Sequence, residues 1–193
     1  MTTSLAKVRD RLGITDLEVQ WNAQLTDQIV ATLERFETET SRKLERGVGV
    51  VEEFDAGKKE VSLERYPVEA ITKWEMMVDG VWTEQAGVVA VARGKGGVVT
   101  LSEALGSVGG LARVTYTGGY VLPDPAGGEG LYPLPQILEI AAVETVVHWW
   151  QWKGQINMTQ VEIPSTGEYR EIGDRYWVPW VRAVLKKSRR FVI

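Results

Sequence analysis

The hydrophobic pattern of this chain changes its period twice, and each change marks a border between helical and strand-rich segments. Between Ser4 and Gly13 the apolar residues recur at helical spacing, so a short amphipathic helix is predicted there. Residues 15–25 have no clear period, and a better helix is predicted to begin at Thr26 and to stop at Gly47. Residues 1–47 are therefore predicted to form two helices, the second with its recurring positions at Ile29, Leu33, Phe36, Thr40 and Leu44.

Residues 48–121 form a strand-rich module, because short apolar runs with a period of two are separated by glycines. Asp79-Gly80 lies between two of these runs and predicts a hairpin, since glycine accepts the positive φ that such a turn demands. We expect a small antiparallel sandwich or barrel. The predicted strands are 48–54, 61–63, 71–78, 88–92, 98–101 and 112–120.

The remainder of the chain returns to helical spacing after a Gly/Pro linker at residues 122–132. Pro135 is placed to start a long helix over 133–154, whose apolar side chains lie all around its axis. Such a helix needs cover on every side, either from its own chain or from neighbouring copies. Residues 155–176 predict an extended, hairpin-like segment, and residues 177–193 predict a basic C-terminal helix or arm that starts at Pro179.

These elements predict an α+β fold in which a small antiparallel β-sandwich or barrel is inserted into a helical frame. The frame consists of two N-terminal helices, one long central helix and a C-terminal helix. We expect residues 1–47 and 133–193 to form one helical domain around the inserted module.

Composition places the chain among ordinary globular proteins, with 193 residues, 44% hydrophobic residues and a net charge of −4. The absence of cysteine excludes disulfides, thiolate metal sites and thiol nucleophiles together. The N-terminus lacks the pattern of a signal peptide, and no apolar run approaches the roughly 20 residues of a membrane span. We therefore expect synthesis in the cytoplasm and no membrane partner.

Candidate catalytic groups are sparse, and we predict no catalytic residue, metal ligand or cofactor site. The single histidine, His148, lies among tryptophans on the apolar helix, where a packed or interface role is expected. Residues 93–97 contain glycines around Lys95, but strands flank them on both sides, so a hairpin turn is favoured over a phosphate loop. Glu52 and Glu53 are neighbours on a strand and point to opposite faces.

The order of five segments resembles the head-tail connector, or adaptor, family of tailed bacteriophages. The resemblance covers nearly the whole chain, and the order of the segments is its specific part. The β-rich module is larger than in the most compact, nearly all-helical adaptors. The five segments are Leu5–Ile14, Glu64–Ile71, Val114–Tyr120, Leu134–Ala141 and Val178–Leu185, the last followed by Arg189-Arg190.

The resemblance implies a structural virion protein without enzymatic activity, located in the neck between head and tail. It implies a dodecameric ring of identical copies that docks beneath the portal protein, meets a stopper or tail-completion protein, and surrounds the passing DNA. The arm expected to bind the portal consists of Trp180, Arg182, Lys186, Lys187, Arg189 and Arg190. The helix residues expected to pack between subunits are Ile137, Ile140, Val143, Val147 and Trp150.

An alternative remains open, in which the protein binds nucleic acid without enzymatic activity through the basic C-terminal arm. Sequence-independent DNA binding falls steeply between low and physiological salt, whereas a largely apolar ring contact does not, so salt dependence separates the two hypotheses. A third, an enzyme acting on glycans through its tryptophans, has the least support, because most tryptophans lie on or near apolar helices.

Overall fold

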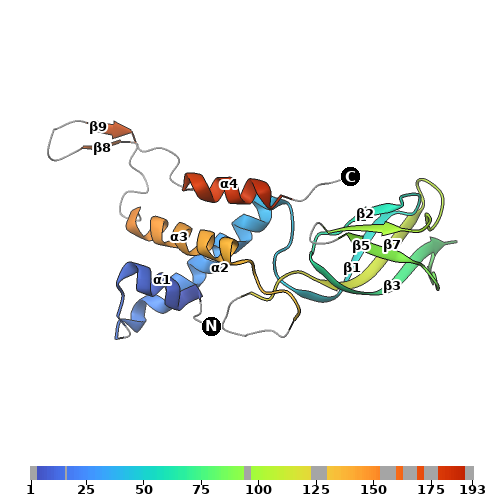
Figure 1. Ribbon diagram of the computed structural model, residues 1–193, viewed down its shortest axis with the longest axis horizontal. Helices are drawn as coiled ribbons and strands as arrows, with labels where there is room; N and C mark the ends of the chain where they lie inside the picture. Colours follow the sequence, from blue (N-terminus) through green and yellow to red (C-terminus); the bar gives the residue numbers. More distant parts are fainter. Residues whose placement is uncertain are drawn as a thin grey trace. The chain divides into compact units, whose positions relative to one another are not determined.

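The chain folds into two compact units (Figure 1). The computed structural model describes residues 4–15, 17–93, 97–122, 130–152, 160–162, 169–171 and 178–189. The helical unit comprises Met1–Glu39 and Pro135–Ser188, and the β unit is built on Thr40–Leu134. Each unit has its own hydrophobic core. The predicted α+β fold is therefore confirmed.

The helical unit begins with α1 (Ser4–Leu12), which ends at Gly13 in the left-handed conformation, as predicted. A 3₁₀ turn, η1 (Val19–Trp21), then runs directly into α2 (Asn22–Thr40). The prediction that Thr26 starts this helix is wrong, because η1 already sets the backbone for a helix at Asn22. The predicted stop at Gly47 is also too late, since Ser41 has a φ of 53° and ends α2 after Thr40.

The core of the helical unit forms where α3 (Gln136–Trp152) meets the N-terminal helices. Both α1 and α4 (Pro179–Lys187) contact α3. Trp21 packs edge to face against Trp150, with ring centroids 5.3 Å apart. This arrangement gives α3 cover from its own chain on most of its sides. The buried core residues are Val8, Leu25, Val143, Val146 and Val147.

The β unit contains two antiparallel sheets, and most strands lie close to their predicted positions. The hairpin between β3 and β4 turns at Asp79 and Gly80, both with positive φ, as predicted. The four-stranded sheet has the order β1-β7-β3-β4 and the three-stranded sheet the order β2-β6-β5. The strands are β1 (Gly47–Asp55), β2 (Glu60–Ser62), β3 (Val68–Val78), β4 (Val81–Glu84), β5 (Ala90–Arg93), β6 (Val98–Leu101) and β7 (Leu111–Gly118).

The two sheets bury one core between them, which makes the unit a sandwich rather than a closed barrel. Trp74, Val114 and Tyr116 enter this core from the four-stranded sheet. Val99 and Leu101 enter it from the three-stranded sheet. The sandwich alternative of the prediction is therefore confirmed.

Backbone hydrogen bonds join the segment that enters the β unit to the segment that leaves it. The Tyr120 N–H donates to the Leu44 carbonyl at 2.7 Å, and the Arg46 N–H donates to the Tyr120 carbonyl at 2.9 Å. The Val121 N–H donates to the Tyr132 carbonyl at 2.8 Å. Gly119 has a φ of 101° and lies against the Glu45 backbone, so only glycine fits there.

The predicted hairpin near the C-terminus is present as β8 (Gln160–Glu162) paired antiparallel with β9 (Tyr169–Glu171). Its predicted turn lies outside the described residues. The same holds for the middle of the predicted linker, residues 123–129, and for residues 94–96, 153–159, 172–177 and 190–193.

Candidate functional site

The C-terminal helix α4 presents one apolar and one basic side. Val178 is extended and Pro179 follows at the start of the helix, where its fixed φ suits the first turn. Val181 and Leu185 are buried, while Trp180 is 39% exposed. The helix contains three cations and no carboxylate. Of the residues expected to bind a portal, Arg182, Lys186, Lys187 and Arg189 are exposed, and Arg190 lies outside the described residues.

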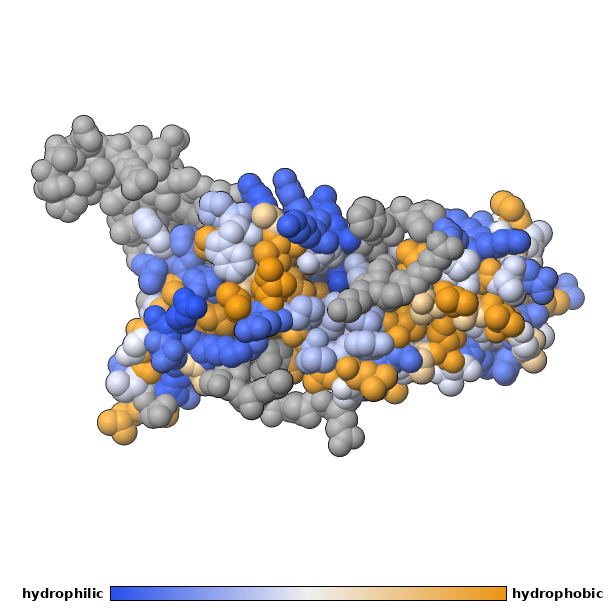
Figure 2. Space-filling model, viewed as in Figure 1, coloured by the Kyte–Doolittle hydropathy of each residue, from blue (hydrophilic) through white to orange (hydrophobic). Residues whose placement is uncertain are grey.

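The five α3 residues expected to pack between subunits fall into two groups. Val143 and Val147 are buried in the core of the helical unit, and Trp150 is partly buried against the same core. Their cover comes from their own chain. Ile137 and Ile140 are 55% and 38% exposed, on the side of α3 that this core leaves uncovered. Figure 2 shows hydrophobic residues gathered over α3, with hydrophilic residues over α1 and α4 on either side.

Ion pairs attach α1 to α3 beside these isoleucines. The Lys7 ammonium lies 2.6 Å from Glu139, whose side chain is 10% exposed, and the Ser4 hydroxyl donates to the same carboxylate at 3.4 Å. Arg11, 58% exposed, pairs with Glu144 at 2.5 Å. These contacts fix the register of α1 along α3, and they leave the Arg11 guanidinium at the surface.

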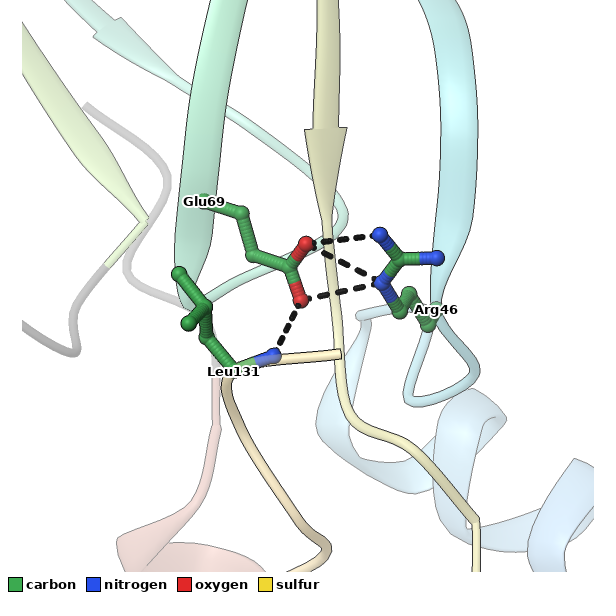
Figure 3. A network of polar contacts seen from close by, with 3 residues as sticks. All are labelled: Arg46, Glu69 and Leu131. Atoms are coloured by element: carbon green, nitrogen blue, oxygen red, sulfur yellow. Dashed lines mark hydrogen bonds and ion pairs between the residues drawn. The ribbon is translucent and has the colours of Figure 1, made fainter. Parts of the chain in front are cut away.

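In the β unit, an ion pair holds the returning chain at the end of the sandwich (Figure 3). The Arg46 guanidinium donates to both oxygens of Glu69, at 2.8–3.0 Å, and the Leu131 N–H donates to Glu69 Oε1 at 3.1 Å. The hydrogen bonds from Arg46 lower the pKa of the Glu69 carboxyl, and the same contact raises the pKa of the Arg46 guanidinium. The contact joins β3 to the segment that leads to α3.

The outer face of the four-stranded sheet carries a second charged network. Glu75 and Arg113 lie opposite each other on β3 and β7, and Arg113 donates to both carboxylate oxygens at 2.7 and 3.1 Å. Lys73 lies 2.8 Å from the same carboxylate, and the guanidinium covers the Trp82 ring at 4.3 Å. The hydrogen bonds from Arg113, and then from Lys73, lower the pKa of Glu75 to about 2.

This lowered pKa predicts a stability loss in acid. The ionised Glu75 is preferred in the folded protein, so its contribution is present above the ordinary glutamate pKa of 4.5 and is lost as pH falls from there towards about 2. We expect the melting temperature of Glu75→Gln to lie below that of the native protein at pH 7, with the gap closing across this range. Thermal unfolding followed by circular dichroism measures it. Glu84→Gln, directly opposite Glu75 on β4, is the control, and a gap independent of pH would contradict the assignment.

Two carboxylates of β1, Glu52 and Asp55, have structural partners. Glu52 accepts hydrogen bonds from the Tyr116 hydroxyl and from the Glu64 N–H. Asp55 accepts from the backbone N–H groups of Gly57 and Gly109, and so fixes two loops. His148 lies 6.0 Å from Trp152, measured between ring centroids.

Within the described ranges, no three His, Cys, Asp or Glu side chains are grouped as metal ligands. In the same part of the chain, no helix combines the length and the apolar content that crossing a membrane requires.

Sequence reasoning missed both charged networks in the β unit. Arg46 and Glu69 are far apart along the chain, and no local pattern signals that they meet. The register of β3 against β7 places Glu75 opposite Arg113. The opposite charges of these two residues could have suggested the pair, but only once that register was known.

No family model matches the chain, and no curated protein matches it. Solved structures do resemble it. A chain of the neck of an empty gene transfer agent particle, computed with C6 symmetry, superposes with a TM-score of 0.58 at 19% identity, covering 100% of this chain and 91% of the other. A chain of the virion of a native gene transfer agent particle gives a TM-score of 0.57 at 17% identity, with the same coverage. At this identity the likeness establishes the fold, and that fold agrees with the resemblance of the sequence to the head-tail connector proteins of tailed bacteriophages.

Proposed function

We propose that this protein is a structural component of the neck of a phage-like particle, where it forms an adaptor ring between the portal and the stopper or tail proteins. The observation that carries the proposal is the likeness to a neck chain over the full length of this chain and nearly all of the other. The fold is shared as a whole, including both the helical unit and the β unit. In this role the protein joins other particle proteins through its surfaces and catalyses no reaction.

The proposed ring uses the helical unit as its wall. Closed rotational symmetry is the usual solution for identical subunits, and a neck computed with C6 symmetry is compatible with rings of six or twelve copies. Of the five α3 residues expected at this contact, Ile137 and Ile140 are exposed to a neighbouring subunit, whereas Val143 and Val147 are buried. The DNA passes through the middle of the ring.

The basic side of α4 is the proposed portal-docking surface. Tryptophan and arginine are enriched at protein interfaces, and Trp180 and Arg182 are both exposed on this helix. Lys186, Lys187 and Arg189 extend the positive charge, which suits an acidic partner surface. The same cations also support the second candidate function, sequence-independent binding of nucleic acid through phosphates.

Mass measurement in solution tests the ring. We expect mass photometry to show a species at a multiple of the 21.5 kDa chain mass, either for the protein alone or after a portal protein is added. Electron microscopy of that species should show closed rings. A protein that stays monomeric and does not bind the portal would leave the adaptor function without support.

A further inference from the structure

The helical unit has a second exposed surface that the proposed function does not use, on α2. Asp27, Val30, Ala31 and Glu34 follow one another at the spacing of a single helix face, and all are exposed, Val30 by 51%. We call these four residues the acidic stripe. Leu25 and Ile29 pack into the core on the other side of α2, so the stripe points away from α3.

Apolar and acidic side chains follow a definite order along the acidic stripe. Its centre, Val30 and Ala31, is apolar, and a carboxylate lies at each end, Asp27 and Glu34, about 10 Å apart along the helix axis. The whole of α2 contains four acidic residues and one basic residue. A partner that fits this stripe has an apolar centre and cations at its borders.

The exposed side of α3 has this complementary chemistry. We call Ile137 and Ile140, together with the Arg11 guanidinium, the isoleucine face. Arg11 reaches this side through its ion pair with Glu144, one turn beyond Ile140. Figure 2 shows the hydrophobic area over α3 between the hydrophilic areas over α1 and α4.

We propose that the acidic stripe of one copy packs on the isoleucine face of the next copy, and that this contact repeats around the ring. The inference rests on the proposed ring and names the two surfaces that build it. Both surfaces belong to the helical unit and point in different directions, so a single copy presents both to two different neighbours. Such a head-to-tail contact generates a closed ring when its rotation closes. The apolar centres exclude water, and the charges at the borders set the register.

Engineered cysteines test this contact directly, because the chain contains no cysteine of its own. Under oxidation, the double variant Ala31→Cys/Ile137→Cys is expected to form a ladder of covalent oligomers, alone or with a portal protein. Each single variant can form dimers at most. The matched control, Ala31→Cys/Thr83→Cys, keeps the α2 cysteine and moves the second one to an exposed position on β4.

Charge reversal provides the second readout. Asp27→Lys/Glu34→Lys in the cysteine background is expected to reduce the ladder at least tenfold, while Glu84→Lys/Glu103→Lys, at exposed positions of the β unit, leaves it unchanged. Circular dichroism checks that each variant is folded. Rings without the ladder would overturn this contact and leave the proposed function standing. The absence of both rings and ladder would remove both, and a ladder that survives the α2 reversal would overturn the role of its charges.

Discussion

Replacing Tyr116 with alanine is expected to destabilise the β unit by about 3–5 kcal/mol, the usual cost of removing a buried aromatic ring. The side chain is fully buried and lies between the two sheets of the sandwich. Its hydroxyl donates to Glu52 and accepts the Arg65 N–H at 3.0 Å. Burial, and then the hydrogen bond to Glu52, raises the pKa of the Tyr116 phenol, so the hydroxyl stays protonated and continues to donate.

Hydrogen exchange followed by mass spectrometry measures this effect separately in each unit. We expect faster exchange in β1, β3 and β7 and unchanged exchange in α3, because the helical unit has its own core. Tyr116→Phe is the matched control, since it keeps the ring and removes only the hydroxyl. Its expected cost is smaller, about 1–3 kcal/mol, from the groups that lose their partner. Equal effects of the two variants would contradict a packing role for the ring.

Reversing the charge of the basic arm is expected to abolish the joining of heads to tails while the protein remains folded. The variant carries glutamate at Arg182, Lys186, Arg189 and Arg190. The three of these positions that the structure describes are exposed, so the core of the helical unit is untouched, whereas an acidic portal surface would repel the new charges. Complementation of particles that lack this protein, with heads counted by electron microscopy, measures the loss, which we expect to exceed tenfold.

A matched control reverses Lys58 and Lys59, two exposed cations of the β unit, and should join heads to tails normally. Normal joining by the arm variant would rule out the arm as the portal-docking element. If the native protein instead binds duplex DNA with an affinity that falls steeply with salt, and the arm variant loses that binding, then the arm binds nucleic acid.

The helix borders that the sequence predicted correctly are those with a local physical cause. The C-terminal helix begins at Pro179 because proline has the φ of a first helical residue, and α1 ends at Gly13 because glycine tolerates a left-handed backbone. The start of α2 had no such cause. Thr26 is a good capping residue by type. However, the turn before Asn22 and the packing of Trp21 on Trp150 move the start of the helix four residues towards the N-terminus, to Asn22.

The exposed residues of α3 could not be separated from its buried ones by pattern. Apolar side chains surround this helix, so its sequence contains no preferred direction. Which residues remain exposed depends on where α1, α2 and α4 pack, and those positions are set by contacts between distant parts of the chain. Ile137 and Val143 are therefore equivalent in the sequence and different in the structure.

The neighbouring ends of the β unit have a consequence for how the protein can vary. The Leu44–Tyr120 and Val121–Tyr132 hydrogen bonds hold the departing and returning segments of the β unit together, so its two ends stay close whatever the length of the loops between them. A long flexible loop would lose entropy when its two ends are brought together, and the hydrogen bonds and core of the sandwich offset that loss here. Exposed loop tips such as the β3–β4 hairpin can therefore lengthen or shorten without disturbing either end of the β unit.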